Sequence, residues 1–274
     1  MELKEFGRTG RKVSEVGMGT YYDPIWIASA FLGWKRGGRR KVEAIRAGLE
    51  SGMTLLDTAE IYQSEALVKE AMAGRKRDEV FLATKVWSSH LHRDDVTKAL
   101  EKSLRRLGTS YIDLYQVHWP NQHVPIAETM GAMEGLIRDG KLNHVGVSNF
   151  DLGQIQGAQS ALPKSELASV QLDYSLVHRN IEGDILPYCT SQKIALIAYY
   201  PLGHGKLVSD GRLDQVCGAL GKTRSQVALQ WLARQETVFP IPRASSPGHV
   251  VENSGSSGWA ISDEQAVEIE RKFR

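Results

Sequence analysis

Cysteine is scarce in this 274-residue chain, which contains only Cys189 and Cys217. Two isolated thiols exclude a disulfide framework and lack the spacing of a metal site, so both are expected to be buried or half-buried. No apolar run approaches the ~20 residues of a membrane span, and the N-terminus lacks the apolar core of a signal peptide. The formal net charge of +2 gives no reason to expect nucleic acid or an acidic membrane as a partner. These absences favour a cytoplasmic protein without a metal.

The chain also lacks the glycine fingerprint G-x-G-x-x-G after a strand, so a Rossmann nucleotide site is not supported. It has no internal repeat, no low-complexity tract and no linker. Its hydrophobic content of 42% and charged content of 24% are ordinary for a globular protein. The length suits a (β/α)8 barrel, which typically takes about 250 residues. We therefore predict a single domain over residues 1–274.

Short apolar runs alternate with helical stripes along most of the chain. The runs are continuous rather than alternating, as expected for parallel strands that are buried on both faces. Two extended runs, at residues 3–6 and 12–16, predict a hairpin before the first strand of the sheet. The alternation predicts an α/β fold, a (β/α)8 TIM barrel. Its strands are expected at residues 16–20, 54–56, 81–84, 114–117, 145–147, 169–172, 195–199 and 239–240.

Helix boundaries are marked by residues that favour helix ends. Ser64 is predicted to cap a helix over residues 65–72, and Asp151 is predicted to cap a later one. Gly108 and Gly140 are predicted to stop two further helices, because glycine readily adopts the left-handed conformation that ends a helix.

Four polar residues stand at or shortly after the ends of predicted strands: Asp57, Tyr62, Lys85 and His118. In a barrel of this kind the carboxyl ends of the strands form the catalytic rim, so these side chains are expected to meet. A tyrosine with a pKa of about 10 is a poor acid at neutral pH, but a nearby ammonium group favours the phenolate. A carboxylate would hold the ammonium, and a histidine could orient a carbonyl oxygen. The pattern predicts a proton-transfer site.

With these residues in place, the sequence resembles the aldo-keto reductases. Motifs in the family's order span nearly the whole chain: LLDTAEIYQSE, FLATKVW, DLYQVHWP, HVGVSNF, ASVQLDYSLVHR, IALIAYYPLG and FPIPRASSPGHVVEN. The resemblance implies that the hairpin closes the bottom of the barrel and that Tyr62 is the general acid in carbonyl reduction. Lys85 would lower the pKa of Tyr62, Asp57 would pair with Lys85, and His118 would orient the carbonyl. Hydride would come from a nicotinamide, so no metal is needed.

The resemblance also implies a cofactor lying across the barrel mouth. Ser148, Asn149 and Gln171 would hold the carboxamide, and Tyr199 would stack on the nicotinamide ring. Thr20 would lie near the ribose and pyrophosphate. The loop over the pyrophosphate and the adenosine end would comprise Tyr200, Pro201, Leu202, Gly203, Arg243, Ser245, His249, Glu252 and Asn253.

The choice between NADPH and NADH depends on the adenosine end. Arg243 offers a guanidinium fork that suits phosphate geometry, so NADPH is expected first and NADH is the alternative. Two departures from the family weaken the phosphate site. Ala244 stands where NADPH-dependent members usually carry serine, and His249 stands where they usually carry arginine. A third departure is Gln63, where the family usually has glycine.

The substrate pocket is implied to contain Tyr21, Trp87 and Trp119, whose aromatic rings favour flat or apolar carbonyl compounds. The aromatic stretch 21–38 allows two interpretations, a flap on the substrate side or a small helix that covers the barrel mouth for packing alone. At the other end of the chain, residues 262–274 predict one amphipathic helix.

These features predict an NAD(P)H-dependent reductase of aldehydes, and of some ketones, with a small-molecule carbonyl substrate. The balanced charge identifies no interface, and a monomer or weak oligomer is expected. One alternative is a barrel aldolase in which Lys85 forms a Schiff base with the substrate. A second alternative is a non-catalytic subunit that senses the cofactor within a larger assembly.

Overall fold

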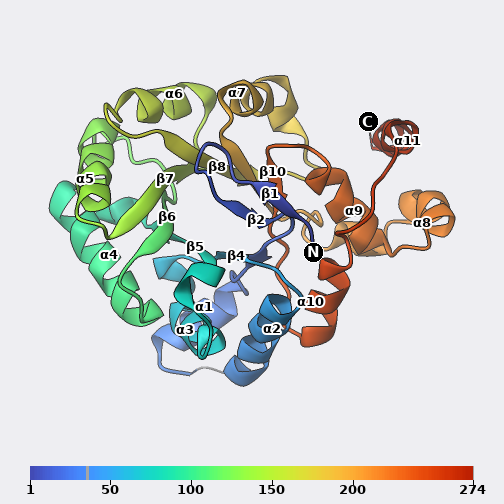
Figure 1. Cartoon of the computed structure of the whole chain (residues 1–274), viewed down its shortest axis with the longest axis horizontal. Helices are drawn as coiled ribbons and strands as arrows, with labels where there is room; N and C mark the ends of the chain where they lie inside the picture. The colour runs from blue at the N-terminus through green and yellow to red at the C-terminus, as the bar shows by residue number, and fades with distance from the viewer. Residues whose placement is uncertain (35–36, 274) are drawn as a thin grey trace.

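Eight parallel strands curl into one sheet at the centre of the molecule (Figure 1). The computed structural model describes residues 1–34 and 37–273. The neighbours in the sheet follow one another along the chain, as in a (β/α)8 barrel. The strands are β3 (Met18–Gly19), β4 (Leu55–Asp57), β5 (Phe81–Val86), β6 (Ile112–Val117), β7 (Leu142–Ser148), β8 (Leu167–Asp173), β9 (Ala195–Tyr199) and β10 (Val238–Pro240).

Backbone hydrogen bonds between the first and last strands bring the edges of the sheet together. The N–H of Gly17 donates to the carbonyl oxygen of Pro240 at 2.9 Å, and that of Gly19 donates to Pro242 at 3.2 Å. Gly19 also forms a parallel bridge with Arg243. A Cβ atom on Gly19 would lie 2.9 Å from the carbonyl oxygen of Ile241. The seam, where the edge at β3 meets the edge at β10, therefore requires a residue without a side chain at position 19. The predicted (β/α)8 fold is confirmed.

Helices surround the sheet and cover its outer face (Figure 1). Asp151 caps its helix in a reciprocal capping box with Gln154, and Gly108 ends another with a φ of 66°, both as predicted. The helices are α1 (Pro24–Phe31), α2 (Gly38–Glu50), α3 (Glu65–Met72), α4 (Arg93–Leu107), α5 (Ile126–Arg138), α6 (Leu152–Ser160), α7 (Ile185–Gln192), α8 (Asp214–Leu220), α9 (Arg224–Ala233), α10 (Pro247–Ser254) and α11 (Asp263–Lys272). Within the described residues, none of them is long and apolar enough to cross a membrane.

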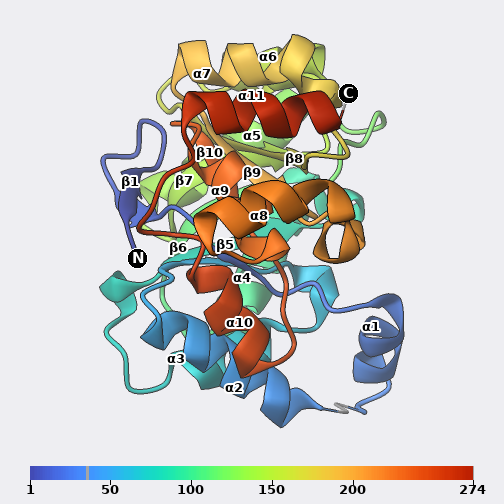
Figure 2. The same ribbon diagram turned by 90° about the vertical axis from the view of Figure 1, so that its right-hand side faces the viewer.

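An N-terminal hairpin of β1 (Leu3–Glu5) and β2 (Lys12–Ser14) closes one end of the barrel. The buried ring of Phe6 lies 4.7 Å from the ring of Phe81 and 4.9 Å from that of Phe239, between centroids. The Lys4 ammonium donates to the carbonyl oxygens of Ala233, Gln235 and Val238, between the end of α9 and the start of β10. Figure 2 shows the hairpin and α1 at opposite ends of the barrel, so the mouth lies on the side of α1.

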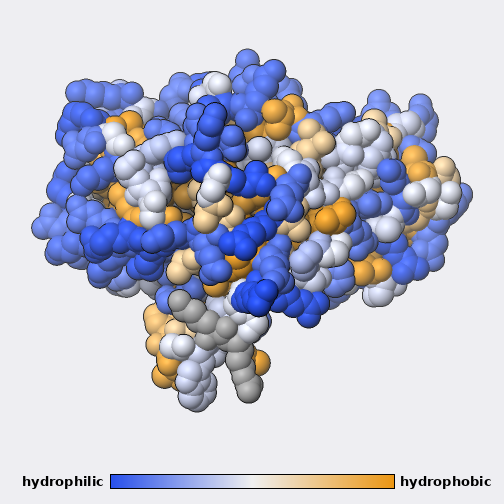
Figure 3. Space-filling view, turned by 60° about the horizontal axis from the view of Figure 1, so that its bottom comes forward, coloured by the Kyte–Doolittle hydropathy of each residue, from blue (hydrophilic) through white to orange (hydrophobic). Residues whose placement is uncertain are grey.

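The aromatic stretch after β3 contains a short helix, α1. The Asp23 carboxylate caps it by accepting the N–H of Trp26 at 2.7 Å. The rings of Tyr22 and Trp26 are buried, with centroids 5.8 Å apart. Figure 3 shows this part of the chain projecting from the body of the molecule. Its exposed apolar side chains are Ile25, Phe31, Leu32 and Trp34.

Several predicted boundaries are wrong by one to three residues. The first strand of the sheet covers only Met18–Gly19, because Val16 and Gly17 run beside the seam without forming a regular ladder. Ser64 precedes α3, but its hydroxyl makes no cap and instead contacts Thr20 and Thr58. The predicted C-terminal helix is confirmed over Asp263–Lys272, while Lys35, Arg36 and Arg274 lie outside the described residues.

Candidate active site

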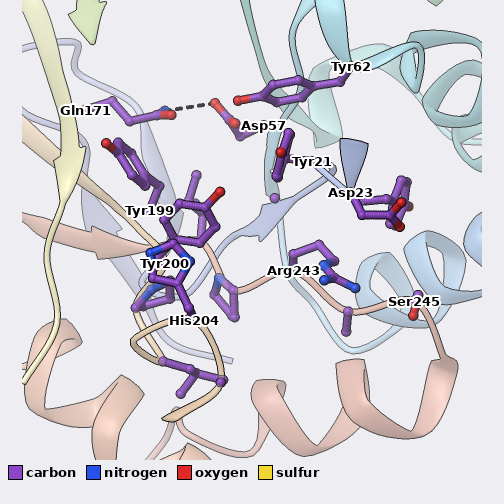
Figure 4. A pocket seen from close by; sticks show the side chains of 18 of the residues that line it. Tyr21, Asp23, Asp57, Tyr62, Gln171, Tyr199, Tyr200, His204, Arg243 and Ser245 are labelled. Carbon is purple, nitrogen blue, oxygen red and sulfur yellow. Dashed lines mark hydrogen bonds between the residues drawn. The ribbon is translucent and has the colours of Figure 1, made fainter. Parts of the chain in front are cut away.

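A cleft of about 860 Å³ opens at the carboxyl ends of the strands. Its inner end is lined by Asp57, Tyr62 and His118, and it extends to Arg243 and Asn253 beside α10. Figure 4 shows the tyrosines of both rims pointing into this space. The cleft joins the predicted catalytic residues to the predicted cofactor residues.

Lys85 and Asp57 form a buried ion pair below the floor of the cleft. The ammonium nitrogen of Lys85 lies 2.6 Å from Oδ1 of Asp57 and donates to the carbonyl oxygen of Thr58 at 2.9 Å. The other carboxylate oxygen of Asp57 accepts from the Gln171 amide at 2.9 Å (Figure 4) and from the Gln116 amide at 3.5 Å. Burial lowers the pKa of Lys85, and the Asp57 carboxylate partly offsets that effect.

Tyr62 ends a short 3-10 turn, Glu60–Tyr62, that follows β4. Its hydroxyl oxygen lies 3.2 Å from Nε2 of His118, and the Lys85 ammonium lies 5.0 Å from the centre of its ring. Burial and the Asp57 carboxylate hold the pKa of Tyr62 well above its usual value. In the protein alone the pKa of Tyr62 is therefore raised and not lowered as predicted, because burial and the Asp57 carboxylate outweigh the Lys85 ammonium.

His118 is neutral throughout the physiological range. Burial, assisted by the positive charge of Lys85, lowers its pKa to about 2. Its Nδ1 atom is buried and has no hydrogen-bond partner among the described residues. A neutral ring has one donor nitrogen and one acceptor nitrogen, so His118 can orient an oxygen but has no proton to release as an imidazolium.

Asn149 connects several strand ends. Its backbone is left-handed, with a φ of 64°, and its amide nitrogen donates to the carbonyl oxygen of His118 at 2.8 Å. The hydroxyl of Tyr199 donates to the amide oxygen of Asn149 at 2.7 Å. Short polar residues such as asparagine adopt this backbone conformation more readily than others. The network fixes the rim that faces Tyr62.

Most residues implied in cofactor binding line the cleft, and all three predicted substrate residues do so as well. The lining set includes Ser148, Asn149, Gln171, Tyr199, Tyr200, Pro201, Leu202, Arg243, Ser245, His249, Glu252, Asn253, Tyr21, Trp87 and Trp119. Thr20 and Gly203 are not in that lining. The Thr20 hydroxyl donates to the backbone oxygen of Asp57 at 3.0 Å, and a Cβ on Gly203 would lie 2.4 Å from a methyl group of Val177.

The arrangement fits a dinucleotide. Arg243 is exposed at the outer end, and the side chain of Ser246 leaves the first N–H groups of α10 without a side-chain cap. A helix N-terminus beside a guanidinium is suited to a phosphate group. Glu252 and Asn253 follow on the same helix.

Sequence reasoning missed two supporting residues. The amide of Gln116 faces Asp57, and its oxygen accepts a hydrogen bond from Ser169 at 3.1 Å. A polar residue within the buried strand β6 is the sequence signal that could have identified it. Glu60 accepts from the backbone N–H of Trp87 and lies 3.0 Å from Nδ1 of His90, so it ties the Tyr62 turn to the loop after β5.

Comparisons with known proteins agree with this geometry. The model of the Aldo/keto reductase family matches residues 33–273. Methylglyoxal reductase YeaE of Escherichia coli (strain K12) is 34% identical over 267 residues, which cover 94% of this chain and 90% of that protein. Glyoxal reductase of Bacillus subtilis (strain 168) is 32% identical over 235 residues, covering 85% and 83%.

Solved structures show the same similarity. An aldo/keto reductase from Klebsiella pneumoniae in complex with NADP and acetate has a TM-score of 0.87 and 34% identity, covering 99% of this chain and 95% of that one. The thermostable aldo-keto reductase Tm1743 with the inhibitor epalrestat has a TM-score of 0.88 and 32% identity, covering 99% and 100%. The chain belongs to the aldo/keto reductase family. It is an NAD(P)H-dependent oxidoreductase.

Proposed function

We propose that this enzyme reduces small neutral aldehydes, and some ketones, to alcohols with NADPH in the cytoplasm. The observation that carries the proposal is the 3.2 Å contact between the Tyr62 hydroxyl and Nε2 of His118 on the floor of the cleft, above the buried pair of Lys85 and Asp57. A carbonyl oxygen placed between these two groups would meet a proton donor and an orienting ring.

Tyr62 is the proton donor in this proposal. Its raised pKa keeps the hydroxyl protonated throughout the physiological range, so the proton is present when the carbonyl binds. NADPH, when bound, supplies the hydride. As negative charge develops on the carbonyl oxygen, the Tyr62 O–H donates to it, and the Lys85 ammonium, 5.0 Å from the ring, stabilises the phenolate that remains.

His118 and Asp57 have positioning roles. A neutral His118 donates one N–H to the carbonyl oxygen without adding a charge that would compete with Lys85. Asp57 holds Lys85 at 2.6 Å and fixes the Gln171 amide at 2.9 Å, so one carboxylate aligns both the proton site and the predicted carboxamide site. Such preorganised contacts stabilise a transition state without reorganisation during the reaction.

In this proposal the cofactor lies along the length of the cleft. Asn149 and Gln171 lie at the nicotinamide end in this proposal, and Arg243 with the N-terminus of α10 lies at the phosphate end. A structural neighbour was solved in complex with NADP, which supports the choice of cofactor.

Small neutral aldehydes are the proposed substrates. The substrate side of the cleft is lined by Tyr21, Trp87 and Trp119, which are aromatic and uncharged. Two relatives are named as reductases of methylglyoxal and glyoxal, which are small and neutral. Aromatic walls bind flat apolar groups, and buried hydrogen-bond donors at the floor fix the carbonyl.

The two alternatives are less compatible with the site. A Schiff-base aldolase requires an accessible amine, whereas the Lys85 ammonium is fully buried and bonded to Asp57 and Thr58. A subunit that only senses the cofactor would not need a proton donor beside an orienting histidine. Neither alternative explains the contact between Tyr62 and His118.

Replacing Tyr62 with phenylalanine tests the proposal. The variant keeps the ring and loses the proton, so turnover of 4-nitrobenzaldehyde should fall by at least about a hundredfold, the scale of general acid catalysis. Binding of NADPH, followed by fluorescence, should be unchanged. If the variant kept more than about a tenth of the wild-type rate, Tyr62 would be rejected as the donor, because the loss of rate would be far smaller than general acid catalysis accounts for.

A further inference from the structure

Arg243 is the one fixed cation among the described residues that line the cleft. Its side chain extends into the space between Asp23 and Ser245 (Figure 4). It makes no hydrogen bond or ion pair within the described part of the chain. A single exposed guanidinium is a modest anion site, and Ala244 and His249 add neither a hydroxyl nor a fixed charge.

A second cation, Lys41 on α2, lies against the aromatic side chains of Tyr22 and Trp26. Its ammonium nitrogen lies 4.4 Å from the centre of the Trp26 ring and 4.9 Å from the centre of the Tyr22 ring. Two aromatic faces hold the charge in place. Burial lowers the pKa of Lys41, the Asp23 carboxylate raises it, and Arg243 and Arg40 lower it again. Lys41 lies against the Tyr22 ring, which lines the cleft together with Arg243, so an anion bound at Arg243 would also be attracted by the charge of Lys41.

Tyr22 connects the two cations. Its ring lines the cleft and is 2% exposed, and its hydroxyl is buried without a hydrogen-bond partner among the described residues. A buried donor without an acceptor is unfavourable unless a ligand supplies one. Arg243 acts electrostatically on this hydroxyl as well, lowering the pKa that burial raises.

Tyr22 also lies close to Ala244, a residue without a hydroxyl. A small recess next to the cleft is lined by Tyr22, Ala244 and Asn253. Ala244 has no hydroxyl to offer to a phosphate bound beside it. A phosphate oxygen is the kind of acceptor that the Tyr22 donor lacks.

We propose that Tyr22 and Lys41 join Arg243 in binding the 2′-phosphate of NADPH. Tyr22 supplies the hydroxyl in place of the residue at position 244, and Lys41 supplies the second positive charge in place of position 249. These two are specificity-determining residues for the cofactor, delivered by the loop after β3 and by α2 rather than by α10. The inference rests on the proposed function, because it takes NADPH as the cofactor.

The test is a fluorescence titration of wild type and variants with NADPH and with NADH. Lys41→Met keeps the apolar stem on the two rings and removes the charge. It should raise the Kd for NADPH about tenfold, as expected for a lost contact to a charged group, and leave the Kd for NADH unchanged. Tyr22→Phe should raise the Kd for NADPH about fivefold with the same selectivity. Arg46→Met is the matched control, because Arg46 lies on the same helix and donates to the Glu70 carbonyl oxygen on α3.

The outcomes separate this inference from the proposed function. Equal weakening of NADPH and NADH would overturn it, because the phosphate contacted would then be the shared pyrophosphate or the effect would be structural. Unchanged NADPH binding in both variants would also overturn it while leaving the reductase proposal intact. Wild-type protein that binds neither cofactor would reject both. If Lys41→Met fails to fold by circular dichroism, Tyr22→Phe decides alone, since it preserves the ring and its packing.

Discussion

The ammonium nitrogen of Lys85 lies 2.6 Å from Oδ1 of Asp57, and both side chains are almost fully withdrawn from solvent. Water cannot replace either partner, so each charge depends on the other. The pair links two neighbouring strands, β4 and β5, directly below the Tyr62 ring. The ion pair therefore affects both the barrel and Tyr62, the proposed proton donor.

Asp57→Asn should destabilise the protein by about 3 kcal/mol or more, because it leaves a buried ammonium without a counter-charge. The free energy of unfolding in urea measures the loss. Adding Lys85→Met to the same chain should recover part of it, since the unpaired charge is then gone. Asp214→Asn is the control, because its partner Arg224 lies at the surface, where such a pair is worth less than about 1 kcal/mol. Losses of similar size in the two single variants would contradict the dependence on burial.

The neutral state of His118 should make stability depend on pH. The pKa of His118 is about 2 in the folded protein, against 6.5 for an ordinary histidine. Between these two pH values the unfolded chain binds a proton on this ring and the folded chain does not. The contribution of the neutral His118 to the free energy of unfolding is fully present above pH 6.5 and is lost as the pH falls below that value. Between about pH 7.5 and about pH 5.5, wild type should lose about 1.4 kcal/mol more than His118→Asn in urea unfolding.

Two observations would count against this prediction. Equal losses in wild type and His118→Asn over the same range would mean that the ring takes up a proton in the folded state. His92 provides a control, because it is more than half exposed beside Glu128, and its replacement by asparagine should leave the wild-type pH dependence in place.

Gln63 follows Tyr62 and adopts the left-handed backbone conformation, with a φ of 58°. A side chain with a Cβ atom is strained there, and glycine is not. Gln63→Gly should therefore raise the free energy of unfolding by about 1 kcal/mol. The greater freedom of glycine in the unfolded chain opposes this gain and makes it slightly smaller. Gln63→Ala is the control, because it removes the amide contact with the Glu60 carbonyl oxygen and keeps the Cβ atom. A stabilising effect of alanine equal to that of glycine would exclude backbone strain as the cause.

The strands that build the site were predictable, because their apolar runs are continuous and each ends in a polar residue. Lys85 and His118 could be placed at the rim from that pattern alone. Strand lengths were less accurate, as at β3, where the seam is formed by isolated backbone bonds rather than a ladder. Helix α9 was missed because it is buried almost all round and therefore shows no apolar stripe.

The electrostatics of the site could not be predicted from residue types. A lysine near a tyrosine suggested a lowered pKa for Tyr62. In the structure Lys85 pairs with Asp57 and the phenol is buried, so the pKa of Tyr62 is raised instead. Ser64 precedes a helix as a cap would, yet its hydroxyl bonds with Thr20 and Thr58 across the barrel rim. Such choices depend on distances between segments that are far apart in the sequence.

Among the described residues, no lysine or arginine lines the substrate side of the cleft, which should appear as selectivity against anionic aldehydes. Tyr21, Trp87 and Trp119 line that side, and none of the three carries a charge. A carboxylate on the substrate would lose hydration there without gaining a partner, which is unfavourable. We expect kcat/KM for 4-carboxybenzaldehyde to be at least about tenfold below that for its methyl ester, equivalent to about 1.4 kcal/mol in the transition state. The ester has the same ring and an uncharged group of similar size, so the comparison isolates the charge. Equal values at low ionic strength would show that the described lining residues do not determine substrate charge.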